Sequence, residues 1–386
     1  MIGVFRFLFL IALVSTVVAE VYRCFLENDA STGEEHCVFR NVRYSTTTRD
    51  ISFEAPSGSA LPPRVTFENS SLMHLPDEFL QTFADKLKVL KVEGCMLRSI
   101  TIIYNMEALY ARGNYITEVK IYQDRSNSLI RELDLSANRL KDLRGISSCK
   151  NLEVLNLSSN EALAEESTID LSTFAIFKQL RELYLSDVGA FYLENNDFKL
   201  PNLQVLDLSR NSLIPSDLRV DSLSQLKALK VLKLNDNNMA ELDYGLLPDL
   251  NSLTTVYLNG NNFRCDTLRT MLKFLHERNI ETPAELYSGC QSHQQEVDGM
   301  CCADHMVIPP KPIPSYPTPS IPIYTHGTDR PTDIIPIDNE IDDNATSVAQ
   351  KVDDIWLWST VAFAITLAII VAAAGFVLYR KRQNAR

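Results

Sequence analysis

The sequence has 386 residues, 45% of them hydrophobic, and its 49 acidic and 37 basic side chains give a net charge of -12 at neutral pH. This balance excludes nucleic-acid binding through net positive charge, and the hydrophobic fraction excludes a chain that is disordered throughout. Of its 50 leucines, 43 lie between residues 61 and 286 and none between residues 287 and 356. This distribution predicts one long leucine-patterned unit followed by a segment of different character.

Residues 1–19 have the features of a secretory signal peptide. A single charge, Arg6, precedes an apolar run from Phe7 to Val14, and small residues lead up to Ala19. An N-terminal membrane anchor is the alternative, but its apolar core would be longer and would not end in a small-residue cleavage site. We therefore expect cleavage after Ala19 and export to an oxidising compartment.

A leucine motif recurs through residues 64–263. Residues 203–213 and 229–239 both fit the frame L-x-x-L-x-L-x-x-N-x-L, and seven further copies fit it with varying strictness. Successive copies are 19 to 28 residues apart, close to the period of about 20 to 29 residues that is typical of leucine-rich repeats. The asparagine position of the frame, here called the marker position, falls at residues 70, 95, 114, 138, 160, 188, 211, 237 and 261.

This repeat predicts an α/β solenoid. In each copy the leucines at the fourth and sixth positions face inward from a short strand, and the residues between them face outward. One strand cannot bury its apolar face alone, so the copies stack into a parallel sheet that lines a concave face. Phe83, Phe177 and Phe198 are expected to fill the opposite, convex side. A leucine-rich helical bundle is the alternative, but it does not explain asparagine at six of the nine marker positions.

Four cysteines lie before or within the repeats. Residues 20–63 form a predicted N-terminal cap, because the open end of a stack must be covered, and a disulfide between Cys24 and Cys37 is expected to close it. Cys95 occupies a marker position and Cys149 lies in a turn that is not adjacent to it. We expect both to be small buried side chains without a mutual disulfide.

The C-terminal cap is predicted at residues 264–302. Apolar residues at helical spacing follow Cys265, and we expect a disulfide from Cys265 to Cys290 to hold this helix in place. Cys301 and Cys302 remain, and neighbouring cysteines rarely bridge each other because the ring is strained. Either one of them links two chains into a homo- or heterodimer, or one closes the cap and its neighbour is incidental.

The segments beyond residue 302 predict a membrane anchor. Residues 303–354 are acidic and hold nine prolines, a composition typical of an extended stalk. Residues 355–379 carry no charge and are long enough to cross a bilayer as a helix. Basic residues follow at once in the short segment 380–386, which should stay cytoplasmic. The sequence thus predicts a type I single-pass protein of the plasma membrane.

The outward-facing residues of the repeat strands form the predicted binding face. Tyrosines at its centre are of the type enriched at binding hot spots, and the acidic residues beside them favour a basic partner surface. The alternative is that these are ordinary solvated strand residues. The predicted face consists of Tyr110, Tyr184, Tyr257, Glu132, Asp134, Glu182 and Asp207.

Three sequons, at Asn69, Asn156 and Asn344, predict N-glycosylation of the exported chain. Asn156 belongs to an outward-facing strand position in the middle of the repeats. A glycan there would obstruct the centre of the predicted face, so we expect a partner to use its flanks or the terminal cap.

The sequence contains no arrangement typical of catalysis. Six histidines are scattered without a paired nucleophile or base, and neither G-x-S-x-G nor a phosphate-binding loop occurs. Cys301, Cys302, Asp304 and His305 lie too close together in the sequence for a typical metal site. The oxidising compartment expected for this protein also favours disulfides over metal binding by cysteine. We therefore expect no enzyme activity, no cofactor and no metal, and a protein that acts by binding other proteins.

The signal peptide, the short cap, the irregular extracellular repeats and the Cys301–Cys302 pair together resemble the leucine-rich immune proteins of mosquitoes, over roughly residues 1–302. Characterised members are secreted disulfide-linked dimers that hold a complement-like thioester protein, so the resemblance implies an inter-chain role for Cys301 and Cys302. The secreted members have a coiled coil after their repeats. In its place this sequence has a predicted stalk and membrane span, and in this it is similar to a transmembrane subclass. The expected function is an innate-immune recognition or complement-associated receptor or co-receptor. The alternative is a cell-adhesion or developmental receptor.

Overall fold

The computed structural model describes residues 20–29, 33–45, 51–56, 61–122, 128–194, 199–213, 220–284 and 289–304. The chain divides into a unit of residues Met1–Pro312 and a second unit of residues Ile313–Arg386. The predicted signal peptide, the stalk beyond residue 304, the predicted span 355–379 and the tail 380–386 all lie outside the described residues. Within the described ranges, no helix has both the length and the apolar character that crossing a membrane requires.

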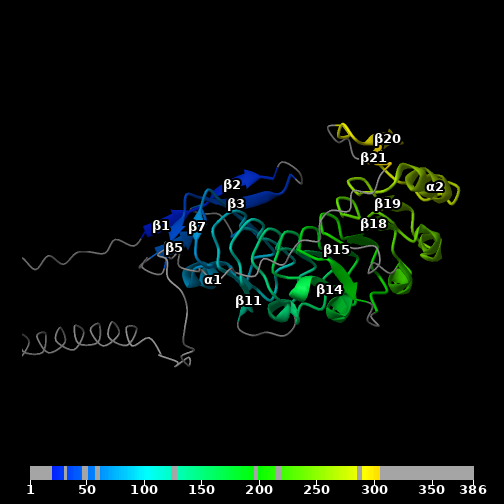
Figure 1. Cartoon of the computed structure of the whole chain (residues 1–386). Helices are drawn as coiled ribbons and strands as arrows, with labels where there is room; N and C mark the ends of the chain where they lie inside the picture. Colours follow the sequence, from blue (N-terminus) through cyan, green and yellow to red (C-terminus); the bar gives the residue numbers. More distant parts are fainter. Residues whose placement is uncertain are drawn as a thin grey trace, which may run out of the picture. The chain divides into compact units, whose positions relative to one another are not determined.

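One sheet of eleven strands runs along the first unit (Figure 1). Neighbouring strands are parallel, except that β2 and β3 form an antiparallel hairpin. The parallel sheet predicted from the repeat is therefore confirmed, and the N-terminal cap extends it. In spatial order its strands are β2 (Phe25–Asn28), β3 (Glu35–Arg40), β6 (Arg64–Glu68), β8 (Val89–Lys91), β10 (Ala108–Tyr110), β12 (Glu132–Asp134), β13 (Val154–Asn156), β15 (Glu182–Tyr184), β17 (Val205–Asp207), β18 (Val231–Lys233) and β19 (Thr255–Tyr257).

A leucine core lies directly behind the repeat strands. Leu133, the middle residue of β12, and Leu135, two positions later, are both fully buried. Because side chains alternate along a strand, Glu132 and Asp134 face the other way. The strands pair in a register that places Leu133 beside Leu109 of β10 and Leu155 of β13. The inward leucines therefore form one continuous apolar layer.

A sharp turn follows each repeat strand. The residue before every one of the nine marker positions has a positive φ, between 46° and 70°, although only three of these residues are glycine. Their recurrence at one place in every copy confirms the nine-copy frame that the leucine pattern predicts. These residues are Asn69, Gly94, Gly113, Ala137, Ser159, Asp187, Arg210, Asp236 and Gly260.

Asparagines at the marker positions connect successive turns. The Oδ1 atom of Asn138 accepts a hydrogen bond from the N–H of Ile116 at 3.0 Å, and its Nδ2 donates to the carbonyls of Ala111 and Leu135, both at 3.0 Å. Each amide thus satisfies backbone groups that the bend leaves unpaired and also joins its repeat to the preceding one. The other members are Asn114, Asn160, Asn211, Asn237 and Asn261.

Short helices and two small sheets cover the convex side. Phe83 and Phe177 are buried there, as predicted, whereas Phe198 lies outside the described residues. Strands β9 (Ser99–Ile102) and β11 (Glu118–Ile121) form one small parallel sheet, and β14 (Thr168–Asp170) and β16 (Tyr192–Glu194) form the other. The helical segments are α1 (Asp77–Phe83) and the 3-10 turns η2 (Arg144–Ile146), η3 (Glu165–Ser167), η4 (Leu171–Ile176), η5 (Val220–Gln225) and η6 (Tyr244–Asp249).

The N-terminal cap closes the first end of the core with aromatic rings. Phe39, Phe53, Phe67, Phe79 and Phe83 pack stacked or edge-to-face, with ring centroids 4.9 to 6.3 Å apart. The predicted disulfide between Cys24 and Cys37 is present and fastens the hairpin. The remaining cap strands pair in parallel, β1 (Glu20–Arg23) with β5 (Ile51–Glu54) and β4 (Arg43–Tyr44) with β7 (Ser71–Leu72).

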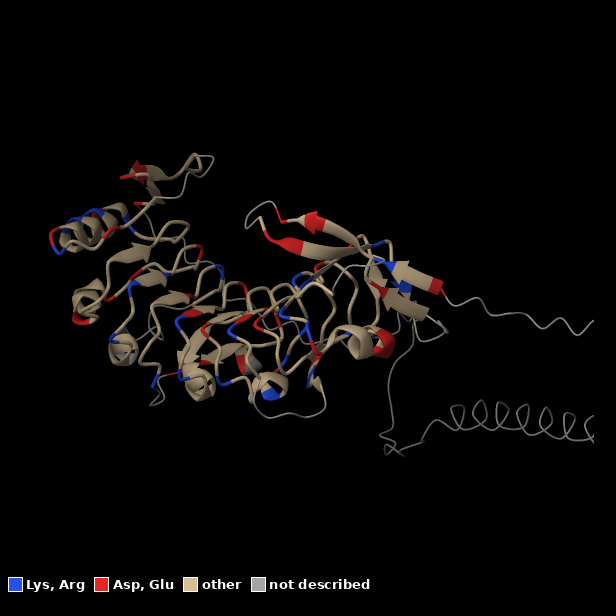
Figure 2. Cartoon of the chain, turned by 180° about the vertical axis from the view of Figure 1, so that it is seen from behind, with Lys and Arg blue, Asp and Glu red and all other residues tan. Residues whose placement is uncertain are grey.

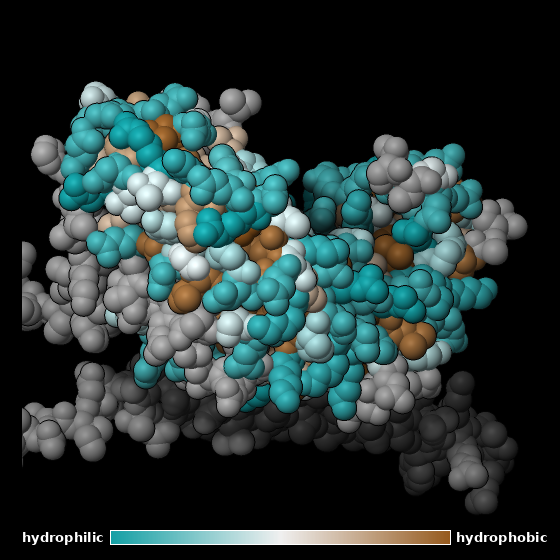
Figure 3. Space-filling view, turned by 90° about the vertical axis from the view of Figure 1, so that its right-hand side faces the viewer, coloured by the Kyte–Doolittle hydropathy of each residue, from teal (hydrophilic) through white to brown (hydrophobic). Residues whose placement is uncertain are grey.

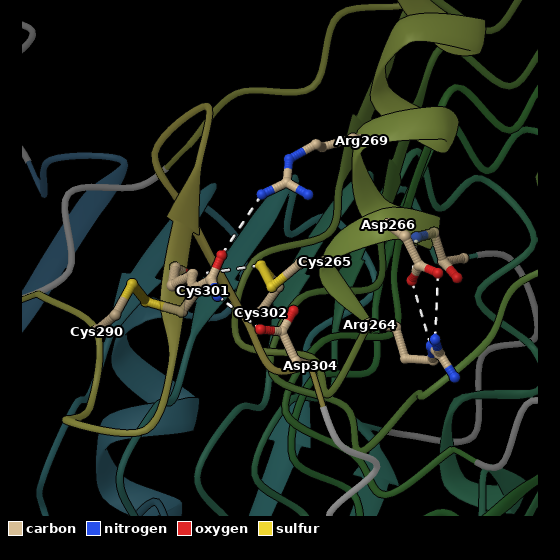
Figure 4. Close-up of a disulfide and its surroundings, with 10 residues drawn as sticks. Arg264, Cys265, Asp266, Arg269, Cys290, Cys301, Cys302 and Asp304 are labelled. Carbon is tan, nitrogen blue, oxygen red and sulfur yellow. Dashed lines mark hydrogen bonds and ion pairs between the residues drawn. A yellow bond between two sulfur atoms is a disulfide. The ribbon is translucent and has the colours of Figure 1, made fainter.

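The C-terminal cap has a different disulfide pattern from the predicted one (Figure 4). Helix α2 (Cys265–His276) follows the last repeat, and the hairpin of β20 (Gln295–Val297) and β21 (Met300–Cys302) packs near it. Cys265 is bonded to Cys302 and Cys290 to Cys301, so the predicted Cys265–Cys290 bond is wrong. Adjacent residues of a strand point to opposite faces, which lets the two cysteines of β21 reach different partners. Both are used within the chain, in place of the predicted inter-chain linkage.

The other two cysteines are free. Cys95 and Cys149 are both fully buried and form no disulfide, as the sequence predicts. Burial raises the pKa of each thiol to about 11. At physiological pH both therefore remain protonated and act as small packing groups.

Candidate functional site

The outward residues of the repeat strands lie in straight rows across the main sheet. The strand register places the third residue of every repeat strand in one line, here called the central row. Its repeat members are Thr66, Lys91, Tyr110, Asp134, Asn156, Tyr184, Asp207, Lys233 and Tyr257. Glu132 and Glu182 lie in the neighbouring row formed by the first residues of the same strands. The structure thus brings all seven predicted face residues onto one side of the sheet, while their role in binding stays a prediction.

Lys233 is the centre of a compact cluster in the central row. Its Nζ lies 3.1 Å from Oδ2 of Asp207, and 5.5 and 5.9 Å from the ring centroids of Tyr184 and Tyr257. Asp207 is itself held in place, because its Oδ1 accepts hydrogen bonds from the N–H and the hydroxyl of Ser209 at 3.0 and 2.6 Å. A cation above a ring face is attracted by the ring quadrupole. These contacts therefore hold both tyrosine rings in fixed positions on the sheet.

Neighbouring carboxylates fix two of the tyrosines further. The hydroxyl of Tyr184 donates to Oε2 of Glu182 at 2.6 Å. Burial first, and then the hydrogen bond and charge of Glu182, raise the pKa of Tyr184 well above its usual value. Burial and Glu132 raise the pKa of Tyr110 in the same way. Both hydroxyls therefore remain protonated hydrogen-bond donors throughout the physiological range.

The acidic residues of this face are largely engaged inside the protein. Asp134 accepts a hydrogen bond from the N–H of Ser136 at 2.8 Å, as Asp207 does from Ser209. A short carboxylate at the end of a strand turns back in this way to satisfy the backbone of the following bend. With Asp207 also paired to Lys233, the face offers a partner less free negative charge than its sequence predicts. Figure 2 shows acidic and basic residues interspersed along the repeats.

The N-terminal hairpin extends the central row, which the sequence analysis missed. Thr66 pairs with Lys91, Val38 pairs with Thr66, and Phe25 pairs with Val38. The row therefore continues across the cap and ends at Phe25. This residue is 58% exposed, the highest value among the large hydrophobic side chains of the described ranges. The signal in the sequence is the apolar set Tyr22, Cys24 and Leu26 at every second position, which is typical of a strand with one buried face.

The predicted glycosylation sites have different surroundings. Asn156 lies in the central row between Asp134 and Tyr184, and its Oδ1 accepts a hydrogen bond from the N–H of Ser158 at 3.1 Å. Asn69 is exposed on a turn at the N-terminal side. Asn344 lies outside the described residues. N-glycosylation at all three sites stays a prediction.

Neither the strands nor the caps gather residues typical of a metal centre. Within the described ranges, no three His, Cys, Asp or Glu side chains lie close enough to hold a metal ion. Figure 3 shows the end of the molecule that carries the C-terminal cap, and its surface is mainly hydrophilic with small hydrophobic areas. The sheet face with its fixed tyrosines is the candidate binding surface that the sequence predicts.

Comparison with protein families identifies the repeats. Residues 201–263 match the family model described as leucine rich repeat, and residues 128–173 match a second model described as two copies of leucine rich repeats. The chain therefore contains leucine-rich repeats. Both matched segments belong to the run of repeats whose strands, turns and marker asparagines are described above.

Curated relatives match part of the chain. Tubulin-specific chaperone E of Danio rerio is 28% identical over 197 residues, which are 45% of this chain and 37% of the relative. Podocan of Mus musculus is 28% identical over 211 residues, 52% of this chain and 32% of the relative. Adenylate cyclase of Schizosaccharomyces pombe is 32% identical over 162 residues, but these are only 9% of that protein. The chain thus spans well under half of the length of these relatives.

Three solved structures resemble the chain at low sequence identity. The leucine-rich repeat domain of APL1B is 22% identical with a TM-score of 0.44, over 65% of this chain and 77% of that chain. The leucine-rich repeat domain of LRIM1 is 18% identical with a TM-score of 0.43, over 63% and 83%. Internalin C2 from Listeria monocytogenes is 24% identical with a TM-score of 0.38, over 50% and 80%.

Proposed function

We propose that this protein acts by binding another protein through the central row and the residues beside it. The observation that carries the proposal is the cluster of Tyr184, Lys233 and Tyr257. Aromatic rings that are already held in one position lose little conformational freedom when a partner covers them, so more of the contact energy remains for affinity. An extended sheet face also suits a macromolecular surface better than a small molecule, which binds in an enclosing cleft.

We propose further that it is a cell-surface recognition protein of type I topology, acting as an innate-immune receptor or co-receptor. The support comes from the sequence: the signal peptide at residues 1–19, the stalk at 303–354, the span at 355–379 and the resemblance to leucine-rich immune proteins. In this arrangement the stalk holds the repeats outside the cell.

Site-specific photo-cross-linking of the full chain tests the binding face. A photoreactive phenylalanine analogue replaces Tyr257 in the central row, and in a matched variant it replaces Tyr192, a 38% exposed tyrosine of β16 on the convex side. Irradiation of cells that display the protein should give a cross-linked partner from position 257 and none from position 192. Adducts from position 192 alone, or equally from both positions, would contradict the proposal.

The topology has a separate test. An epitope tag placed after residue 19 should be accessible to antibody on intact cells, whereas a tag after residue 386 should become accessible only when the cells are permeabilised. Recovery of both tags from the culture medium would overturn the membrane-anchored role and leave the binding face intact as a proposal.

A further inference from the structure

A cavity of about 650 Å³ lies on the convex side of the repeats, next to β14 (Figure 1). Three successive copies of the repeat supply its walls, through residues 141–147, 163–176 and 185–194. Sites for small molecules in proteins usually have volumes between about 300 and 1,000 Å³. The cavity is therefore large enough to hold a small molecule.

The cavity lies where the repeat departs from its usual pattern. The last position of the frame, two residues after the marker, holds a buried leucine, isoleucine, methionine or phenylalanine in seven of the nine copies. The other two copies are successive and have alanine there, at Ala162 and Ala190. Ala162 is exposed, and Ala190 is buried but small. These two copies thus place no large side chain at a position that the others use to fill the core.

The inner wall of the cavity is apolar. Phe174, Leu185 and Val188 line it and are at most 3% exposed. Leu143 and Leu163 also line it and are half-buried, so the apolar wall continues toward the surface. An apolar group that enters this space leaves water and contacts carbon atoms on several sides, which favours its binding.

Carboxylates gather at the outer part of the cavity. The register of β14 and β16 places Asp170 directly beside Glu194, and Glu166 adds a third acidic side chain to the lining. Asp170 is held in place, because its two oxygens accept hydrogen bonds from the N–H and the hydroxyl of Ser172 at 2.8 and 2.7 Å. Like charges in direct opposition on neighbouring strands are unfavourable. A cation at this place would offset their repulsion.

The basic side chains of the lining do not balance these carboxylates. Arg144 already pairs with Asp142 at 2.7 Å, and the same carboxylate accepts a hydrogen bond from the N–H of Arg144 at 2.9 Å. Among the described residues that line the cavity, this leaves Lys141 as the single basic group against three carboxylates. The charge at the entrance is therefore negative on balance, which attracts a cation and repels an anion.

We propose that this cavity binds a small apolar amine in its protonated form. The apolar body of the ligand contacts Phe174, Leu185 and Val188, and its ammonium group lies beside Asp170 and Glu194. The ligand class follows from the combination of an apolar inner wall with an acidic entrance. The site is on the convex side and does not depend on protein binding by the central row.

Two probes that share one ring system and differ in charge test the proposal. Equilibrium dialysis of the full chain against naphthylmethylamine and against naphthylacetate, followed by naphthalene fluorescence, measures the binding of each at neutral pH. The amine should bind with a dissociation constant below about 1 mM, in keeping with its small size. The acid should bind about tenfold more weakly or not at all. Absence of amine binding, or binding of the acid as tight as that of the amine, would overturn the proposal.

Filling the cavity locates the bound amine. Thr168 is a half-buried residue of β14 that lines the cavity, and Thr168→Trp should lower amine binding by about tenfold or more. The matched control is Thr101→Trp, at a half-buried threonine of β9 on the other small sheet, which should leave binding unchanged. Unspecific uptake is the same for both variants, so the difference between them reports the cavity. Amine binding that survives Thr168→Trp would place the site elsewhere and contradict the proposal.

Charge reversal at the entrance should change which probe binds. Glu194→Lys should weaken binding of the amine by about tenfold and strengthen binding of the acid by a similar factor. Glu241→Lys, a reversal at an exposed position that is not part of the cavity lining, should change neither. A gain in binding of the acid cannot result from unfolding, so this variant stays decisive even if Thr168→Trp does not fold. An unchanged preference for the amine in Glu194→Lys would show that the entrance carboxylates do not hold the ligand.

Discussion

The backbone N–H of Leu140 donates a hydrogen bond to Oδ1 of Asn160 at 2.9 Å, across two successive turns of the solenoid. The Nδ2 of this fully buried asparagine donates to the carbonyls of Leu135 and Leu157, at 3.0 and 2.8 Å. One side chain thus satisfies three backbone groups that water cannot reach.

Replacing this asparagine should be severe. We expect Asn160→Ala to lower the free energy of unfolding by about 3 kcal/mol or more, because several buried backbone groups lose their partners together. The matched control is Asn238→Ala, which removes an exposed amide whose contact with Ser212 is a long 3.5 Å. Thermal unfolding followed by circular dichroism measures both. Similar melting temperatures for the two variants would contradict the role of the marker amides.

Two turn glycines should respond differently to the same substitution. Gly113 and Gly260 both have a φ of 70°, so Gly→Ala should destabilise each by roughly 1 kcal/mol through backbone strain. At Gly113 the added methyl would have no atom closer than 3.9 Å, whereas at Gly260 it would overlap Oδ1 of Asp236. Gly260→Ala should therefore lower the melting temperature clearly more than Gly113→Ala. Equal losses would show that Asp236 moves aside freely.

The thiol content of the protein follows from its disulfides. Of the eight cysteines, only Cys95 and Cys149 are free, and burial raises the pKa of both to about 11. A thiol reagent should find no reactive group in the native protein at pH 8, and two groups after denaturation without reductant. The double variant Cys95→Ser, Cys149→Ser should give none in either state. A native thiol traced to Cys301 or Cys302 would show that the C-terminal cap is bonded otherwise.

The two disulfides of the C-terminal cap should differ in their effect on stability. Cys265–Cys302 closes a sequence separation of 37 residues and Cys290–Cys301 one of 11. Chain entropy alone then predicts losses of about 4 and about 3 kcal/mol when each is removed by paired Cys→Ser changes. The former bond is also fully buried, at the start of α2. Denaturant unfolding of the two double variants should preserve this order, and the reverse order would argue against the pairing.

Stability should fall at alkaline pH because of Tyr184. Its pKa is raised in the folded protein by burial and by Glu182, so the unfolded chain loses this proton first, from about pH 10 upward. The folded state retains the proton and is therefore progressively disfavoured as the pH rises above that value. Glu182→Gln removes the neighbouring charge and should make the loss of melting temperature between pH 8 and about pH 11 smaller. Glu161→Gln, at an exposed position, should behave like the unmodified protein.

The repeat architecture could be predicted from the sequence because each copy carries its own local signal. The leucine spacing sets which side of a strand is buried, and it located all nine turns, including those at Ala137 and Arg210 where no glycine marks the positive φ. The same logic placed Tyr184 and Asp207 on one face. These inferences need only the alternation of a strand and the stacking of identical units.

Features that depend on contacts between different units could not be predicted in this way. The pairing of Cys290 with Cys301 depends on the turn of the β20–β21 hairpin, which cysteine spacing does not reveal. The ion pair between Lys233 and Asp207 depends on the register in which β17 and β18 pair. Phe25 lies in the central row because β2 pairs with β3 and β3 pairs with β6. These cap strands lie outside the leucine frame, so the frame does not predict their pairing. In each case the deciding contact joins residues that no single repeat contains.

Val188 stands at the one marker position between Asn160 and Asn211, and its apolar side chain cannot form the amide bridge that the asparagines provide. This position follows the longest interval between markers, 28 residues. In a stack where each repeat is stabilised by its neighbours, a missing bridge lowers the coupling between the parts on either side. Here other contacts join the two repeats in place of the amide: the ladder of β14 with β16 on the convex side, and the hydrogen bond of 3.1 Å that the hydroxyl of Ser159 donates to Asp187.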